Sequence, residues 1–474
     1  MKKKLIILMI LMMCGFTACS QTSGKTGDKA DTETEESDED EDEDSSSKKK
    51  DKKKDKEKEK SAEYTKEFKE LEGKWQIVSR KYYYGDYGDK LADMDMDFYF
   101  SEDDYIDGYV EFYEEDGNWY ADLQESENEY YSESYHFPAR VVKTPLYEEC
   151  ENQSWHVIVD NPRKGEAVFE AAITGDNKLE MYSDYSDEGL EDGYSWRSAN
   201  ISTFYKEGSE ELDDKGNLCY EKTVTVSSAK ELAEAIDNNT RIILKQGDYD
   251  FSSDMGDFTN PKVTWDFGCL RVSEVSYLKL EAEDGSEAEV TIDDPYSAVI
   301  RFEGCNRVVL DGVTVGHRVE PGTCGAPVLE MKSSYNMFVN NCHLYGCGSY
   351  GLEAYDCSSI YFNNTEIYEC SYGIMFCNGC YYMEFNNCDM HDNSMYTMIE
   401  LYDAHSVFFK ECTFKHNIVS EMYYNEGKFV HTDDDCNYVK FTDCDFRDNT
   451  YASFADETVE IENCSFDDDV HPMD

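Results

Sequence analysis

The sequence predicts an all-β protein in which an antiparallel β barrel or sandwich precedes a parallel β solenoid. Two observations support this prediction. Residues 66–208 contain short runs of alternating aromatic and polar residues separated by turn-forming segments, which is typical of antiparallel strands. Residues 220–474 contain a repeat: the sequence FNNT at 362–365 returns as FNNC at 385–388, 23 residues later. Self-similarity at such a period indicates a solenoid.

Residues 1–19 have the features of a lipoprotein signal peptide. Lysines at positions 2–4 precede an apolar run over residues 5–13, which is too short to span a bilayer. The following FTAC at 16–19 resembles a bacterial lipobox, with Phe16 where Leu is more usual. By that resemblance Cys19 becomes the lipidated first residue of the mature protein. An ordinary cleaved signal peptide is the alternative. From the signal peptide and the lipobox, we expect an extracytoplasmic protein held at the cell membrane only by lipid.

Residues 20–65 are predicted to form a disordered charged tether. An acidic block at 33–44 and a lysine-rich block at 48–60 leave almost no apolar side chains there. Such a segment cannot bury enough apolar surface to offset the entropy lost on ordering.

The net charge of −59 argues against nucleic acid as a partner. An extracellular polysaccharide or a surface protein is the expected partner.

The β domain over residues 66–208 resembles the lipocalin-like (calycin) barrels at two points. Its sequence begins LEGKW at 71–75 and has Trp196-Arg197 before its last predicted strand. The resemblance implies that Arg197 packs over Trp75 and closes the floor of the barrel. Small barrels of this kind are often filled by their own side chains.

The repeat unit of residues 220–474 has two columns of small side chains eight residues apart. Apolar residues recur three and five positions after the first column, which is the period of a strand. Three short strands around corners then make one coil, and the coils stack in parallel. The first column is Cys305, Ser334, Cys357, Cys380, Ala404, Cys436 and Asp456, and the second is Val313, Cys342, Thr365, Cys388, Cys412, Cys444 and Cys464.

The residue before the second column is expected at a corner with a left-handed backbone. Asn341, Asn364 and Asn387 stand there, and Asn tolerates that conformation. A third column is predicted to repeat this arrangement at the next corner: Cys347, Cys370, Asn393, Asn417 and Asn449. The cysteines are expected to fill tight inward corners as small apolar groups. Free buried thiols are favoured, although disulfides between coils stay open.

An amphipathic segment over residues 228–236 is expected to close the open end of the solenoid. Leu232, Ala233 and Ile236 form its apolar face. With this cap, the corner pattern and the apolar columns, residues 224–468 resemble the right-handed parallel β-helix proteins of the pectate-lyase-like superfamily. The resemblance implies a right-handed parallel β-helix solenoid. In family members that act on polysaccharides, the substrate groove lies on the sheet preceding the bend opposite the Asn corner.

Two rows of outward side chains are predicted on that sheet. The first row is Arg301, Glu330, Glu353, Phe376, Glu400 and Thr432, and the second is Glu303, Lys332, Tyr355, Asn378, Tyr402 and Asp434. Glu330 and Glu353 are expected one coil apart, about 5 Å, so that repulsion raises the pKa of one of them.

The candidate catalytic residues are Glu330, Glu353, Glu400, Arg301 and Lys332. The carboxylates could flank a sugar bond, and the cations could neutralise a uronate or act as base. The candidate substrate-binding residues are Tyr355, Phe376, Asn378 and Tyr402, with Tyr423 and Tyr424 in a long connecting segment over residues 419–428. An ordinary solvated strand surface is the alternative for both sets.

The sequence departs from the family's enzymes in its motifs. Gly316-His317-Arg318 only partly matches the polygalacturonase Gly-His-Gly, and the Ca²⁺-binding Asp clusters of pectate lyases have no clear equivalent. Three consecutive aspartates at 433–435 are the candidate for a Ca²⁺ site, since carboxylates are the ligands Ca²⁺ prefers.

Recognition of an extracellular carbohydrate or surface partner is the leading hypothesis for the function of the protein. A polysaccharide lyase or glycoside hydrolase and a structural or adhesive stalk are the alternatives.

Overall fold

The computed structural model describes residues 68–86, 92–99, 107–128, 131–142, 156–161, 166–187, 196–213, 216–253, 258–266, 268–320, 322–323, 325–346, 349–420 and 427–467. Residues 1–65, over which the signal peptide with Cys19 and the charged tether were predicted, lie outside these ranges. The chain forms two compact units, and the main division falls between Leu218 and Cys219. Within the described residues, no helix has the length and hydropathy needed to cross a membrane.

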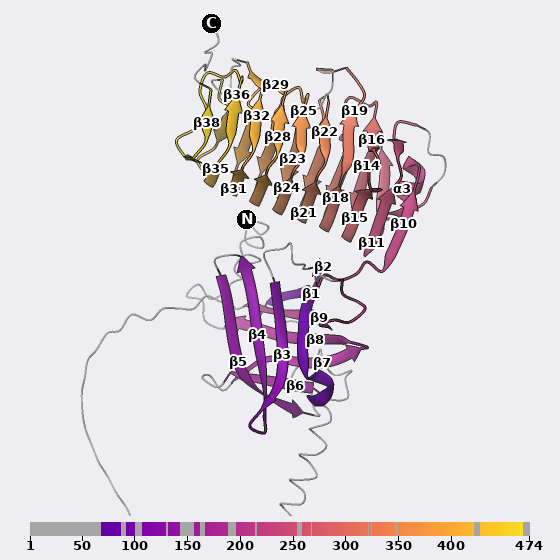
Figure 1. The fold of residues 1–474 in the computed structure, drawn as a ribbon, viewed down its shortest axis with the longest axis vertical. Helices are drawn as coiled ribbons and strands as arrows, with labels where there is room; N and C mark the ends of the chain where they lie inside the picture. The colour runs from indigo at the N-terminus through magenta and orange to yellow at the C-terminus, as the bar shows by residue number, and fades with distance from the viewer. Residues whose placement is uncertain are drawn as a thin grey trace, which may run out of the picture. The chain divides into compact units, whose positions relative to one another are not determined.

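The N-terminal unit is a closed antiparallel barrel (Figure 1). Eight strands form the ring because β1 pairs with both β3 and β9, while β2 adds to β1 from outside the ring. The closure decides between the barrel and the sandwich that the sequence left open. The strands are β1 (Gly73–Asp86), β2 (Ala92–Tyr99), β3 (Asp107–Glu115), β4 (Asn118–Asn128), β5 (Tyr131–Val142), β6 (His156–Asn161), β7 (Glu166–Gly175), β8 (Lys178–Asp187) and β9 (Trp196–Lys206).

Apolar side chains fill the barrel, and Trp75 lies among them with 1% of its surface exposed. The Trp75 indole Nε1 donates a hydrogen bond to the Leu71 carbonyl oxygen over 2.7 Å. The cation over the Trp75 ring is Lys206, whose Nζ lies 5.3 Å from the ring centroid. The side chain of Arg197, which was expected in that place, lies outside the described residues. The lipocalin-like resemblance therefore stays a prediction.

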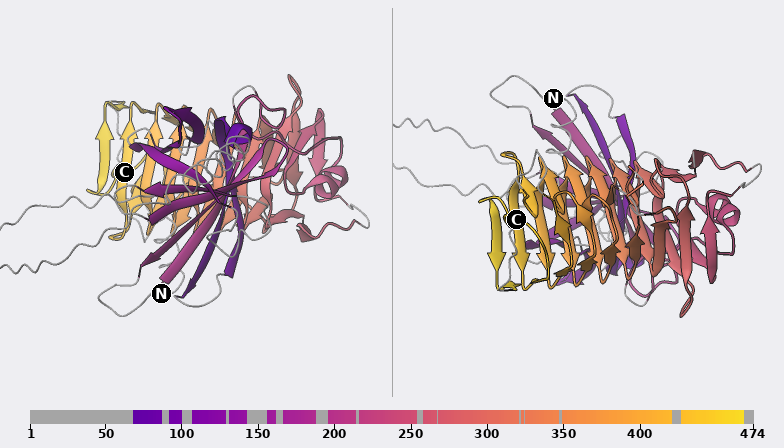
Figure 2. Two further views of the ribbon diagram at one scale, coloured as in Figure 1. Left: turned by 90° about the horizontal axis from the view of Figure 1, so that it is seen from below. Right: turned by 90° about the horizontal axis from the view of Figure 1, so that it is seen from above.

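The C-terminal unit is a parallel β-helix, and Figure 2 shows its coils stacked along one axis. Three long sheets run the length of this axis, and every pairing in them is parallel except β13 with β14. The β10–β37 sheet contains β10 (Lys222–Val226), β11 (Thr240–Leu244), β15 (Ser276–Ala282), β18 (Asn306–Asp311), β21 (Tyr335–Asn340), β24 (Ser358–Asn363), β27 (Tyr381–Asn386), β31 (His405–Lys410), β35 (Asn437–Thr442) and β37 (Val459–Glu462).

The other two long sheets supply the remaining sides of each coil. The β12–β38 sheet contains β12 (Gly247–Asp250), β16 (Ala288–Ile292), β19 (Val313–His317), β22 (His343–Tyr345), β25 (Glu366–Tyr368), β28 (Asp389–His391), β32 (Thr413–Lys415), β36 (Asp445–Arg447) and β38 (Ser465–Phe466). The β13–β34 sheet contains β13 (Val263–Asp266), β14 (Cys269–Ser273), β17 (Ile300–Glu303), β20 (Leu329–Lys332), β23 (Tyr350–Tyr355), β26 (Gly373–Asn378), β30 (Ile399–Tyr402) and β34 (Val430–Thr432). A short pair, β29 (Ser394–Met395) and β33 (Ile418–Val419), lies at one corner.

The predicted left-handed corner is present. Asn341, Asn364 and Asn387 have φ of 53°, 50° and 50°, respectively. Their side chains hydrogen-bond along the axis, with Asn387 Nδ2 donating to Asn364 Oδ1 over 2.7 Å. The interior continues the same stacking: the rings of Phe362 and Phe385 lie 4.9 Å apart. Register therefore repeats from coil to coil at both the surface and the core.

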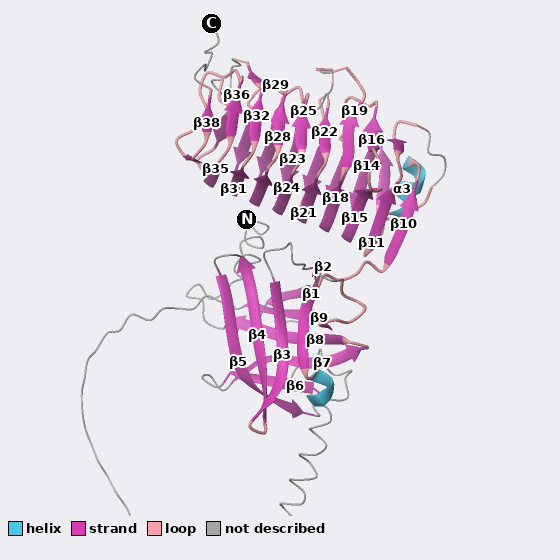
Figure 3. Ribbon diagram, in the orientation of Figure 1, coloured by secondary structure: helices cyan, strands magenta, loops and turns pink. Residues whose placement is uncertain are grey.

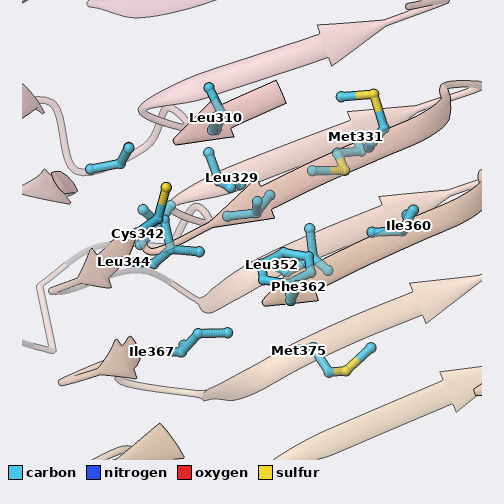
Figure 4. Close-up of a cluster of buried hydrophobic side chains, with 14 of the residues drawn as sticks. Leu310, Leu329, Met331, Cys342, Leu344, Leu352, Ile360, Phe362, Ile367 and Met375 are labelled. Carbon is cyan, nitrogen blue, oxygen red and sulfur yellow. The ribbon is translucent and has the colours of Figure 1, made fainter. Parts of the chain in front are cut away.

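The predicted cap and the apolar interior are also present. Helix α3 (Ala229–Ala235) begins after the N-cap Ser228 and buries Leu232 and Ala233 completely. Figure 3 shows this helix in cyan at the end of the unit where the first coil begins. Figure 4 shows inward side chains of successive coils, including Leu329, Leu352 and Met375, meeting in the interior.

The cysteines of the described residues are free thiols. Those in the two columns are buried, apart from Cys464 in the last coil, which is partly exposed. Burial raises the pKa of the Cys305 thiol to about 11 and that of Cys342 to about 12. A buried thiol with so high a pKa is a poor nucleophile at neutral pH. Cys305 and Cys342 therefore pack as small apolar groups, as the sequence analysis favoured.

Candidate functional site

The outward side of the β13–β34 sheet carries the predicted rows (β14 and β23 are labelled in Figure 1). Strand pairing sets Arg301 beside Glu330, Glu330 beside Glu353, Glu353 beside Phe376, and Phe376 beside Glu400. The second row is Glu303, Lys332, Tyr355, Asn378 and Tyr402, in the predicted register. We call this outward side, from β17 to β34, the candidate face.

The predicted register is wrong at the last coil. Glu400 pairs with His431, and Thr432 pairs with the inward Leu401. The turn that follows β34 accounts for this shift. In this turn Cys436 N donates to Asp433 O, and the segment between the outward residue of β34 and the column residue Cys436 is one residue longer than in the preceding coil. A shift of one residue exchanges the two faces of a strand. His431 therefore lies on the candidate face, Thr432 is 6% exposed, and Asp434 leaves the second row.

Glu330 is held by two cations. Arg301 Nε donates to Glu330 Oε2, and Lys332 Nζ lies 2.5 Å from Glu330 Oε1. The Glu330 side chain is only 6% exposed, whereas the side chains of Arg301 and Lys332 are 28% and 36% exposed. Lys332 also lies over the Tyr355 ring, with its Nζ 5.4 Å from the centroid. Both Glu330 oxygens are thus occupied in an almost buried ion cluster.

Glu353 is the carboxyl whose pKa is raised. Burial is the largest cause, and the negative charge of Glu330 adds to it; hydrogen bonds from Ser349 and Tyr355 act in the opposite direction. Ser349 Oγ donates to Glu353 Oε1, and Tyr355 OH donates to Glu353 Oε2 over 3.0 Å. The direction agrees with the sequence prediction. The main cause differs, since desolvation outweighs repulsion between the two carboxylates.

Glu400 is held by two tyrosines from different coils. Tyr350 OH donates to Glu400 Oε1 over 2.8 Å, and Tyr402 OH donates to Glu400 Oε2 over 3.4 Å. Burial and the neighbouring Glu400 charge raise the pKa of Tyr402 to about 12 and raise that of Tyr350 further still. Both hydroxyls therefore stay protonated as donors at neutral pH. The carboxylate is fixed in position, with 8% of the Glu400 residue exposed.

Aromatic rings surround Phe376 in the middle of the candidate face. Its ring centroid lies 5.6 Å from that of Tyr355, 5.5 Å from Tyr402 and 5.9 Å from Tyr350. Tyr355, Phe376 and Tyr402 come from three successive coils. Each is half-buried, so part of each ring meets solvent. Asn378 is exposed between Tyr355 and Tyr402. Flat apolar surface and polar groups thus alternate along the solenoid axis.

Sequence reasoning did not include Ser349 and Tyr350. Ser349 immediately precedes β23, and Tyr350 begins it. Both lie outside the two predicted rows, yet Ser349 donates to Glu353 and Tyr350 donates to Glu400. A weak signal exists, because Ser-Tyr-Gly occurs at 349–351 and again at 371–373 before the next strand of the sheet. Tyr423 and Tyr424 lie outside the described residues.

Asp433 and His317, from the Ca²⁺ and Gly-His-Gly candidates, make hydrogen bonds within the protein. Asp433 accepts hydrogen bonds from the backbone nitrogens of Asp403 and Asp435, at 3.1 and 3.2 Å. No group of three or more His, Cys, Asp and Glu side chains gathers to hold a metal ion among the described residues. His317 is 2% exposed, and its Nε2 lies 2.9 Å from the Ser297 carbonyl oxygen. Burial lowers the pKa of His317.

Comparison with known proteins identifies the fold of the C-terminal unit. Residues 288–431 and 327–471 match the family described as "Right handed beta helix region". This match and the three parallel sheets define a right-handed β-helix. A comparison with curated protein sequences finds no match.

The solved structures that align with the chain at low similarity include an adhesin and a glucanase. PfbA, a surface adhesin of Streptococcus pneumoniae, aligns with a TM-score of 0.27 and 13% identity over 51% of this chain and 63% of PfbA, less than two thirds of the adhesin. The catalytic domain of a GH87 α-1,3-glucanase in complex with nigerose aligns with a TM-score of 0.28 and 9% identity over 83% of this chain and 74% of the glucanase. Likenesses of this size carry no inference about activity.

Proposed function

We propose that the protein is a lipid-anchored surface protein whose candidate face binds an extracellular carbohydrate. The observation that carries the proposal is the aromatic cluster of Tyr355, Phe376 and Tyr402, with Glu353 and Glu400 fixed beside it. Rings present an apolar surface to the C–H face of a sugar, and fixed carboxylates accept hydrogen bonds from its hydroxyls. Because the polar groups are already held by neighbours, little side-chain entropy is lost on binding.

The locked state of the carboxylates supports binding over catalysis. Glu330 contacts two cations, and Glu400 accepts from two tyrosine hydroxyls. A general acid must transfer its proton to the substrate, which requires a carboxyl that can leave its existing partners. One observation favours the alternative of a glycoside hydrolase or polysaccharide lyase: the raised pKa of Glu353, which lies beside Glu330 in the sheet. Glu353 is then the general acid.

Polysaccharide binding and turnover by the full chain test the two functions together. Bound polymer, new reducing ends and unsaturated products are recorded for each polysaccharide. For a binding protein, we expect no products, about fivefold weaker binding in Tyr402→Ala, and affinity kept within about threefold in Glu353→Gln, since one aromatic contact contributes about 1 kcal/mol. Turnover that is lost in Glu353→Gln, with the fold intact, would instead establish the enzyme. No binding and no turnover with any polymer would reject both.

A further inference from the structure

We infer that the carbohydrate bound by the candidate face is uncharged. This inference rests on the proposed function and concerns the chemical class of the ligand. The opposite expectation came from the two cations Arg301 and Lys332, which could neutralise a uronate or act as base. The charges of the described residues on the β13–β34 sheet argue against it.

The cations on this sheet are already paired with carboxylates of the same sheet or the adjoining coil. Arg271 Nη2 lies 2.8 Å from Glu303 Oε2. Arg301 and Lys332 both contact Glu330, as described above. Beside β34, Lys428 Nζ lies 2.6 Å from Asp456 Oδ1. A uronate ligand therefore has to compete with a protein carboxylate for each of these cations.

Glu330 makes this competition unfavourable. Its side chain is 6% exposed, and the two cations are the partners of its two oxygens. A uronate that took Arg301 and Lys332 for itself would leave a nearly buried carboxylate without its counter-ions. Removing one partner of a buried ion pair is strongly destabilising, because the remaining charge is neither paired nor hydrated. The cluster thus fixes the face and does not serve as an anion site.

The aromatic part of the face is flanked by two acidic side chains. Glu353 and Glu400 lie on either side of Phe376 in the first row, and Glu353 Oε2 and Glu400 Oε2 accept hydrogen bonds from the hydroxyls of Tyr355 and Tyr402. A sugar stacked on Phe376 would thus place a uronate carboxylate close to one of two protein carboxylates. Like charges at such distances repel, and the repulsion is stronger where water is partly excluded.

An uncharged sugar makes favourable contacts with the same groups. Its hydroxyls can donate to the free lone pairs of Glu353 and Glu400, and a carboxylate is a stronger acceptor than a neutral oxygen. The Asn378 amide, exposed between Tyr355 and Tyr402, offers both a donor and an acceptor. The rings of Tyr355, Phe376 and Tyr402 follow one another on three coils. Since coils are about 4.8 Å apart, the three rings span roughly 10 Å along the solenoid axis.

Binding of matched neutral and anionic polysaccharides to the full chain tests the inference. Soluble glucomannan, mixed-linkage β-glucan and xyloglucan are compared with polygalacturonate and alginate in affinity electrophoresis or by biosensor. Each polymer is measured in low salt and in 1 M NaCl, where the Debye length is about 3 Å, so that general repulsion by the net charge of −59 is screened. Phe376→Ala tests the candidate face. Phe408→Ala, an outward half-buried Phe of β31 on the β10–β37 sheet, is the matched control.

The expected result is binding of at least one neutral polymer, unchanged within about twofold by salt, with at least tenfold weaker binding in Phe376→Ala and wild-type binding in Phe408→Ala. Neither polyanion is expected to bind at either salt concentration. Binding of a polyanion that is lost in Phe376→Ala would overturn the inference and leave the proposed carbohydrate-binding function intact. Absence of binding to every polymer in the wild type would overturn the proposed function, and the inference with it.

Discussion

At the scale of single residues, Glu353 shows how neighbours decide the behaviour of one carboxyl group. Its position in the outward row follows from the repeat, but its raised pKa follows mainly from burial beneath adjacent side chains. Two hydroxyl donors, Ser349 and Tyr355, partly oppose that effect. The protonated form of Glu353 is therefore favoured more in the folded protein than in the unfolded chain.

The raised pKa predicts how Glu353→Gln changes stability with pH. A carboxyl whose pKa is higher in the folded state binds its proton more tightly there, so wild-type stability falls as pH rises from about 4 through the folded pKa. The amide does not ionise and escapes this loss. We expect the free energy of unfolding of Glu353→Gln, relative to wild type, to increase between pH 4 and pH 7. Guanidinium unfolding at several pH values measures it.

Glu460→Gln on the exposed terminal strand β37 is the control for this experiment. Its stability relative to wild type is expected to change little over the same pH range, because an exposed carboxyl has a similar environment in both states. A relative stability of Glu353→Gln that fell with rising pH would contradict the assignment of burial as the main cause.

At the scale of structural elements, the corner formed by Asn393, Asn417 and Asn449 holds successive coils in register. Asn417 is completely buried, and its Nδ2 donates to Met390 O and to Asn449 Oδ1, each over 2.9 Å. Its Oδ1 accepts from the backbone and side chain of Asn393. All the hydrogen-bonding groups of this amide are thus used between coils, where water is absent.

Asn417→Ala should lower the free energy of unfolding by about 3 kcal/mol or more, because it leaves several buried polar groups without partners and each costs about 1–3 kcal/mol. Asn364→Gly is the comparison. Asn364 lies at the exposed corner with φ of 50°, which suits Gly, and water can replace its lost hydrogen bonds. We expect it to cost about 1 kcal/mol or less. Equal losses in denaturant unfolding of the two variants would contradict the role given to the buried ladder.

At the scale of the whole molecule, the order of segments supports presentation of the β-helix outside the cell. We propose that a lipidated Cys19 and the charged segment over residues 20–65 tether the two folded units to the membrane. The lipid anchor is a proposal drawn from the FTAC sequence at 16–19. Acyl chains on one residue give stable anchoring when more than one is attached.

Replacing Cys19 tests the anchor directly. On expression in a bacterial host, we expect the wild-type chain in the membrane fraction and most of Cys19→Ala in the soluble extracytoplasmic fraction. Cys14→Ala changes a cysteine five residues upstream in the same signal sequence and should stay with the membrane. Membrane retention of Cys19→Ala, or loss of both variants from the membrane, would reject lipidation at Cys19. Immunoblots of the separated fractions provide the measurement.

The repeated features of the β-helix could be predicted from the sequence alone. The coil period, the corner at Asn364, the inward cysteines and the cap over residues 228–236 each depend on local preferences that recur at a fixed spacing. The four steps of register from Arg301 to Glu400 follow from the same spacing. Repetition makes such patterns visible, since a local signal that is weak in one coil is present again in the next.

Only the tertiary structure decided the features that depend on contacts distant in sequence. Closure of the barrel comes from the pairing of β1 with β9, and hairpins of the same alternation would suit a sandwich equally. Tyr350 reaches Glu400 across 50 positions, and the turn after β34 moves His431 onto the candidate face. These contacts follow from packing and turn geometry. A local sequence pattern specifies neither, because the same strand can meet different neighbours when one turn gains a residue.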